Sequence, residues 1–420
     1  MNLESNAVTP GSTSLRSADP SRGTNQSGVR LYNERLILSL IRRHESLAKV
    51  EIARLTGLSV QTTSGITNRL EKDGLLLRKN PQRGRVGQPA VPFVLNPEGA
   101  FSVGLKIGRR SCDLVLIDFV GRVRRRLHRT YGYPLPDPVI ELVEEGIGSL
   151  TGDLSAEETR RISGIGIAIP FELWNWEKEV GAPPQVMDQW RTVDVPAKIA
   201  RLCPWPVSVC NDATAACAAE LFFGDGWHHH DFIYFFIGSF IGGGVVINSS
   251  LYLGRTGNAG AVGSMPVAHA AANGGVVTQQ LIRSASIYSL ETRLIAAGKD
   301  PSTIWQSPED WADFGEQLNE WIEEVASNLA QAVVSAVSII DFEAAVIDGA
   351  FPASIRAKIV RCTAAKVEHF DRQGLSPVVI REGSIGSDAR AIGGAALPLL
   401  ADFARDREVL FKEATGAARS

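Results

Sequence analysis

The chain has 420 residues and a formal net charge of −3 at neutral pH, with 44% hydrophobic and 21% charged residues. This length exceeds what one simple core holds and predicts two or three domains of ordinary globular composition. We expect no membrane partner, because no apolar run is long enough to cross a bilayer and the N-terminus lacks the pattern of a secretory signal. The five cysteines are scattered without a CxxC pair, which is typical of reduced thiols in a cytoplasmic protein.

The charge is divided unevenly along the chain. Residues 1–100 hold 14 Lys and Arg against 8 Asp and Glu, whereas the remainder holds 29 against 38. A basic head on an acidic body is typical of a phosphate-contacting module joined to a domain with a different task. Within the head, residues 1–28 are rich in Ser, Gly, Asn and Pro and are predicted to be a disordered tail.

Residues 29–98 predict a DNA-binding module. An amphipathic helix at 33–44 precedes two short helical patterns that meet at Gly57, where a positive φ is easily tolerated. Ser59 is a natural N-cap for the second of these helices, and the small residue Ala53 stands where the two helices must touch. This is the spacing of a helix-turn-helix.

The second helix of this pair presents hydrogen-bonding side chains on the face opposite Ile66 and Leu70. Such short or planar groups suit base edges and phosphates in a major groove. The residues that we expect to contact DNA from this helix and its cap are Ser59, Gln61, Thr62, Ser64, Thr67, Asn68 and Arg69.

A basic turn at 81–89 lies between strand patterns at 74–79 and 92–95, so a wing completes the helix-turn-helix. We expect Arg83, Arg85 and Gln88 to contact DNA from this wing. The alternative is an ordinary helical hairpin with a solvated polar face. Because the turn, the cap, the polar face and the basic wing all agree, DNA binding is the favoured interpretation.

Strand and helix patterns alternate through the body, residues 99–420. Strands are predicted at 101–107, 112–118, 162–170, 207–210, 232–237, 244–248, 344–347 and 377–380, and helices at 139–154, 195–202, 213–223, 277–297, 311–340 and 352–370. This alternation predicts α/β lobes whose sheets are covered by helices. Glycine-rich turns at 164–170, 238–244 and 347–350 would let backbone N–H groups approach a phosphate or a sugar, although such turns also occur for steric reasons alone.

The order of these segments resembles the ROK family, named for repressors, open reading frames and kinases. The stretches that carry the resemblance are 164–170, 207–213, 218–224, 238–244, 252–260 and, in the wing, 84–89. The resemblance implies a two-lobed, actin-like ATPase fold like that of sugar kinases, and in the repressor branch an N-terminal winged helix-turn-helix. It covers essentially everything after Arg30.

The chain departs from the kinase members of that family at the phosphate loop. Where they carry Asp-x-Gly-Gly-Thr, residues 106–110 are Lys-Ile-Gly-Arg-Arg, so the groups that organise metal and phosphate are missing, while Lys106 and Arg109 could still attract an anion. Asp212 matches the general base of the kinases. We expect it to contact a sugar without catalysing a reaction, and capping of the helix that follows is a compatible alternative. No catalytic residue is therefore predicted.

A second departure concerns zinc. The family's Ala-Gly-Glu-Ile-Gly-His motif is Ala-Gly-Ala-Val-Gly-Ser at 259–264, so Ala261 and Ser264 replace a sugar-binding Glu and a zinc-binding His. The cysteine loop is also missing, because no cysteine occurs between Cys217 and Cys362. We expect no metal and no cofactor. The histidines at 228–230 and His269 are interpreted as loop or packing residues rather than ligands.

Several groups remain to bind a ligand. By their match to the family these are Pro170, Phe171, Asn211, Asp212, Gly257 and Asn258. Three tryptophans, Trp174, Trp176 and Trp190, fall around the expected cleft, where they would stack on a sugar or simply form core.

The leading hypothesis is a cytoplasmic transcriptional regulator that binds double-stranded operator DNA and represses genes of carbohydrate use. A sugar or sugar-derived effector would close the lobes, and this closure would change the spacing of the DNA-binding heads in a homodimer or homotetramer. The alternatives are a sugar kinase that uses Asp212 as its base, and a ligand-independent DNA-binding protein whose body only oligomerises.

Overall fold

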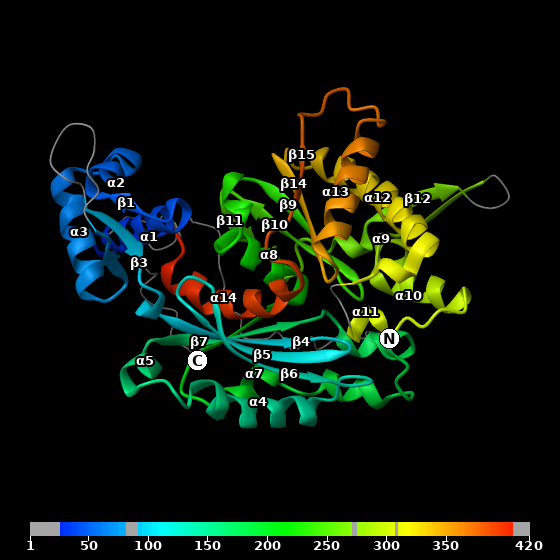
Figure 1. The fold of residues 1–420 in the computed structure, drawn as a ribbon, viewed down its shortest axis with the longest axis horizontal. Helices are drawn as coiled ribbons and strands as arrows, with labels where there is room; N and C mark the ends of the chain where they lie inside the picture. Colours follow the sequence, from blue (N-terminus) through cyan, green and yellow to red (C-terminus); the bar gives the residue numbers. More distant parts are fainter. Residues whose placement is uncertain (1–25, 81–90, 271–274, 307–309, 406–420) are drawn as a thin grey trace, which may run out of the picture.

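The computed structural model describes residues 26–80, 91–270, 275–306 and 310–405, which form an N-terminal head and a two-lobed body (Figure 1). The α/β architecture predicted from the sequence is confirmed. Within this described part of the chain, no helix combines the length and the apolar character that a membrane crossing requires. All five cysteines are free thiols.

The head is a small helical domain closed by a three-stranded sheet. Its elements are α1 (Gln26–His44), β1 (Leu47–Ala48), α2 (Lys49–Thr56), α3 (Val60–Lys72), β2 (Leu76–Arg78) and β3 (Pro92–Leu95). The strands pair antiparallel in the order β1-β3-β2. The predicted turn is confirmed: Gly57 has a φ of 70°, and the Ser59 side chain accepts a hydrogen bond from the Thr62 N–H at 3.0 Å. Because α1 begins at Gln26, residues 26–28 of the expected tail are helical.

The first lobe of the body is built on a five-stranded sheet. Its elements are η1 (Pro97–Gly99), β4 (Phe101–Ile107), β5 (Ser111–Asp118), β6 (Val123–Thr130), α4 (Pro136–Thr151), α5 (Ala156–Arg160), β7 (Ile162–Ile169), η2 (Leu173–Trp176), α6 (Glu177–Val180), η3 (Val186–Arg191), α7 (Val195–Ile199) and β8 (Val207–Asn211). The strand order is β6-β5-β4-β7-β8, with β4, β7 and β8 parallel. Helices α4 and α7 cover one face of this sheet (Figure 1).

The second lobe repeats this plan with a sheet of order β11-β10-β9-β14-β15. Its elements are α8 (Asp212–Phe222), η4 (Asp225–His228), β9 (Phe232–Ile237), β10 (Ile241–Ile247), β11 (Ser250–Tyr252), η5 (Val262–Ser264), β12 (Pro266–Ala270), β13 (Val276–Gln280), α9 (Leu281–Ser284), α10 (Ile287–Ala296), α11 (Thr303–Gln306), η6 (Ala312–Phe314), α12 (Gly315–Val337), β14 (Ala344–Gly349), α13 (Ala353–Val367), β15 (Val379–Glu382) and η7 (Gly386–Asp388). Helices α12 and α13 pack together over its outer face, and their core includes the fully buried Trp321.

One long helix joins the two lobes. Helix α14 (Ala389–Phe403) packs against α8 and against β4 and β7 of the first lobe, so α8 and α14 form the layer between the two sheets (Figure 1). The approach is very close: a Cβ on Gly393 would overlap the Ala215 carbonyl oxygen, and one on Gly166 would overlap that of Gly394. Glycine at these positions is therefore required by packing.

Several short elements, such as α5 and β11, were not predicted, and three further differences affect the architecture more. Strand β6 was not predicted, because its sequence Val-Arg-Arg-Arg-Leu-His-Arg-Thr lacks apolar alternation, and as an edge strand it is almost wholly exposed. The helix predicted at 277–297 does not begin at 277, because Val276–Gln280 form β13, which pairs with β12. The β-branched Val-Val-Thr at its start suits a strand, and the helical pattern begins only at α9. Helix α14 was also not predicted.

Candidate DNA-reading face and ligand cavity

Helix α3 presents most of its predicted DNA-contacting residues to solvent. Ser59, Gln61, Thr62, Asn68 and Arg69 are exposed, and Ser64 is half-buried. Ordinary helix geometry explains this exposure, because Ile66 and Leu70 lie on the opposite side of α3 and pack into the core of the head. A row of hydrogen-bonding groups therefore remains available for contact with DNA.

The prediction for Thr67 is wrong. Its side chain is fully buried, and its hydroxyl donates to the Thr63 carbonyl oxygen at 2.9 Å. Thr63 and Thr67 stand one helical turn apart on the same side as Leu70, so both pack into the core. The polar character of threonine concealed this in the sequence, because a threonine in a helix can satisfy its hydroxyl on the preceding turn.

Lys49 is a member of this face that the sequence did not indicate. Its Nζ donates to the Ser64 hydroxyl at 3.0 Å and to the Asn68 Oδ1 at 2.9 Å, which links the start of α2 to α3. Because the Oδ1 of Asn68 accepts from Lys49, the Nδ2 donors of Asn68 lie on the side of its carboxamide that faces away from Lys49. Arg69 is held differently, in an ion pair with Glu34 of α1 at 2.7 Å. The wing residues Arg83, Arg85 and Gln88 lie outside the described residues.

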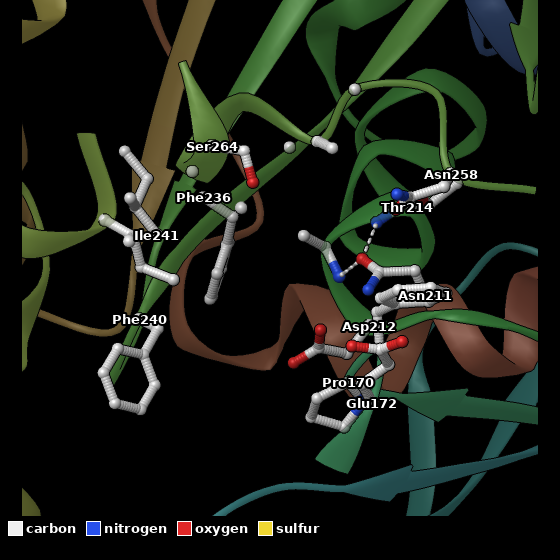
Figure 2. A pocket seen from close by; sticks show the side chains of 18 of the residues that line it. Pro170, Glu172, Asn211, Asp212, Thr214, Phe236, Phe240, Ile241, Asn258 and Ser264 are labelled. Carbon is white, nitrogen blue, oxygen red and sulfur yellow. Dashed lines mark hydrogen bonds between the residues drawn. The ribbon is translucent and has the colours of Figure 1, made fainter. Parts of the chain in front are cut away.

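A cavity of about 290 Å³ lies between the two lobes (Figure 2). Five of the six predicted ligand residues line it: Pro170, Phe171, Asn211, Asp212 and Asn258. Gly257 does not line the cavity and forms the exposed turn before Asn258, with a φ of 75°. Arg109, which the sequence indicated as a possible anion contact, also lines it, together with residues that the sequence did not single out as ligand contacts: Asn175, Thr214, Phe236, Phe240 and Ile282.

The three tryptophans have different positions. Trp176 lines the cavity, whereas Trp190 is buried in the core of the first lobe and Trp174 packs against that core. The indole N–H of Trp190 donates to the Pro134 carbonyl oxygen at 3.1 Å, which satisfies its polar group within the lobe. The core interpretation therefore holds for two of the three.

Asn211 and Asp212 have distinct tasks at the start of α8. Asn211 is the N-cap, since its Oδ1 accepts hydrogen bonds from the N–H groups of Ala213 at 3.0 Å and Thr214 at 3.4 Å. The cap of α8 is therefore Asn211, and the alternative that Asp212 caps this helix is wrong. Asp212 is buried, and its Oδ2 accepts a hydrogen bond from Arg390 Nη1 at 3.2 Å. The carboxylate of Asp212 is therefore already engaged by a guanidinium within the protein.

Lys106 does not face the cavity, so the expectation that it attracts an anion there is wrong. Its Nζ donates to the Ser111 hydroxyl at 2.6 Å and to Asp113 Oδ2 at 3.0 Å, and Asp113 also pairs with His128 at 2.6 Å. Burial and the charge of Arg390 lower the pKa of Lys106, against the opposing effect of Asp113. The loop position that carries the Asp in the kinases is thus occupied by an internal ion-pair cluster.

Arg109 from the same loop does line the cavity. Its guanidinium contacts two aromatic rings at once, 4.7 Å from the ring centroid of Trp176 and 4.4 Å from that of Phe240, and these two centroids are 4.3 Å apart. Phe240 in turn contacts Tyr288 of the second lobe, with ring centroids 5.5 Å apart. This cation–π stack connects the two lobes at one side of the cavity.

The segment 259–264, where the zinc motif of the family is replaced, also lies at the cavity, and Ala261 and Ser264 line it. Within the described ranges there is no group of three or more His, Cys, Asp and Glu side chains placed to hold a metal ion. In the histidine loop, the ring of His228 stacks on Trp227 and His230 contacts the Ser249 hydroxyl at 2.8 Å.

Comparison with known proteins places these features in context. The ROK family model matches residues 102–400, and a winged helix-turn-helix DNA-binding model matches residues 30–76. The xylose repressor of Bacillus subtilis (strain 168) is 27% identical over 246 residues, which are 58% of this chain and 62% of that protein. The chain thus spans less than two thirds of the length of that relative.

Two solved structures share the fold. One is a ROK family transcriptional regulator described as a homolog of the MLC protein of E. coli, with a TM-score of 0.59 and 19% identity over 91% of this chain and 98% of that one. The other is a ROK family glucokinase from Streptomyces griseus in complex with glucose and AMPPNP. Its TM-score is 0.52 and its identity 19%, over 71% of this chain and 99% of that one.

Proposed function

Since the chain belongs to the ROK family, we propose that it is a cytoplasmic transcriptional regulator that binds double-stranded operator DNA and a sugar or sugar-derived effector. The observation that carries the proposal is the pairing of two features in one chain. Helix α3 exposes Gln61, Thr62 and Asn68, and a cavity between the lobes retains Asp212, while the loop beside it carries Arg109 and lacks the phosphate-loop motif. The DNA-reading head is the output of this protein, and the body is its sensor.

The DNA-binding half of the proposal predicts a salt-sensitive complex with a defined operator. We expect footprinting of the DNA upstream of the gene to show protection of two half-sites about one or two helical turns apart, because a homodimer or homotetramer presents two heads by symmetry. Affinity for the operator should fall steeply as salt rises, since Lys and Arg displace counterions from phosphates. Uniform protection along any DNA would contradict sequence-specific regulation.

We further propose that the body does not phosphorylate sugars. The Asp212 carboxylate is paired with Arg390, and Lys106 is held by Asp113 within the first sheet. Neither a free general base nor the phosphate loop of the kinases is then available. A coupled ADP-release assay with D-xylose, D-glucose and their phosphates should stay at background. Turnover that is lost in Asp212→Asn would instead support the kinase alternative.

A further inference from the structure

Helices α8 and α14 both run from the ligand cavity to the DNA-binding head. Asp212 is the first residue of α8 and Arg390 the second of α14, and the hydrogen bond between their side chains joins the two helices beside the cavity. At an axial rise of about 1.5 Å per residue, the 15 residues of α14 span roughly 22 Å. Figure 1 shows the far end of α14 beside α1.

The far end of this helix pair holds α1 through two arginines. Arg35 donates from Nη2 to the Ala401 carbonyl oxygen at 2.8 Å and from Nη1 to that of Ala404 at 3.3 Å, so it binds the C-terminal end of α14. Arg42 lies 4.1 Å from the ring of Phe222, the last residue of α8, and donates to the Phe119 carbonyl oxygen at 2.8 Å.

The core of the head is continuous with this layer. One cluster of buried residues includes Ile37 and Ile41 of α1 together with Ala395 and Leu399 of α14. Within the described residues, the head and the body therefore share one packed core along this path. Between the two ends, the absence of a side chain at Gly393 lets the backbones of α14 and α8 pack in close contact.

Arg390 stands at the point where a ligand would act on the layer. Its side chain is 11% exposed, and its Nε has no hydrogen-bond partner among the described residues. A sugar hydroxyl that donates to Asp212 shares the carboxylate with Arg390 and changes the contact that fixes the start of α14. Because packed helices move as rigid units, a shift at this end reaches Arg35 at the other.

We propose that Arg390 is a positioning residue that couples the cavity to the DNA-binding head through the α8–α14 layer. This rests on the proposed function, to which it adds the route of regulation. A ligand bound at Asp212 changes the position of α14, and α14 in turn changes the position of α1 through Arg35. By linkage, DNA on the head must alter the cavity through the same contacts.

The test is hydrogen exchange of backbone amides in the full-length protein, without ligand or DNA. In Arg390→Met we expect exchange in residues 35–44 of α1 to accelerate by about threefold or more, and Arg390→Lys should restore part of the protection. The reciprocal variant, Arg35→Met, should accelerate exchange in the first turn of α8. The matched control is Arg129→Met, which removes a surface ion pair with Glu145 at 3.1 Å and should change neither region.

Exchange at wild-type rates in α1 of Arg390→Met, or in α8 of Arg35→Met, overturns the proposal. If Arg390→Met does not fold, Arg35→Met alone decides, since it lies outside the cavity. A second measurement is the ratio of operator affinities with and without D-xylose or D-glucose, which should move towards one in both variants. An absence of operator binding by the wild-type protein would show that the proposed function is wrong, whereas the exchange result still tests the coupling.

Discussion

The double variant Gln61→Ala/Asn68→Ala should lose specific operator binding while keeping its general affinity for DNA. Both side chains are exposed on α3: Gln61 offers a planar amide suited to paired hydrogen bonds with a base edge, and Asn68 offers its amide donors while its Oδ1 accepts from Lys49. Each lost contact of this kind costs about 1–3 kcal/mol, or about 2–6 kcal/mol for the two together, so affinity for the operator should fall by roughly 30-fold to more than 10,000-fold. Mobility-shift titration against operator and scrambled DNA measures the ratio.

Thr67→Val is the matched control for that variant, because it lies on the same helix but faces the core. It removes the hydroxyl that donates to Thr63 and should cost about 1 kcal/mol of folding free energy without changing operator specificity. The salt dependence of binding should be the same in all three proteins, since none of these residues carries charge. Loss of specificity in Thr67→Val, with the double variant unaffected, would show that α3 does not read the operator.

Removal of Asp212 should abolish the response to the effector and destabilise the body. In Asp212→Ala the buried guanidinium of Arg390 loses its carboxylate partner, and breaking a buried ion pair in this way costs about 3–5 kcal/mol. In the wild-type protein, an effector at 100 times its Kd should add about 2.7 kcal/mol of stability. Thermal unfolding with D-xylose, D-glucose and their phosphates should show this stabilisation in the wild-type protein alone.

Asp212→Asn separates the two effects. It keeps a hydrogen-bond acceptor for Arg390 and should recover much of the lost stability, but it should not recover full effector affinity, because the charge on the acceptor is gone. An effector that stabilises Asp212→Ala as much as the wild-type protein would show that Asp212 serves only the fold. Operator binding with no thermal shift from any sugar would favour the ligand-independent alternative.

Local patterns in the sequence were sufficient to predict the helix-turn-helix. The positive φ of Gly57, the cap at Ser59 and the burial of Ile66 and Leu70 all depend on neighbours within a few residues. Buried strands such as β7 and β9 were recognisable for the same reason, as continuous apolar runs. The exposed basic strand β6 had no such pattern, and only its pairing with β5 makes it a strand.

The sequence by itself thus determined the winged helix-turn-helix head, the α/β body and five residues that line the cavity. The tertiary structure decided the rest. In the folded protein Thr67 is buried, Lys106 pairs with Asp113 away from the cavity, and Asp212 pairs with an arginine 178 positions away. The fold also joins Arg35 to the end of α14 across 366 positions. These contacts depend on how distant segments pack, and the residue types alone carry no record of which partners folding will bring together.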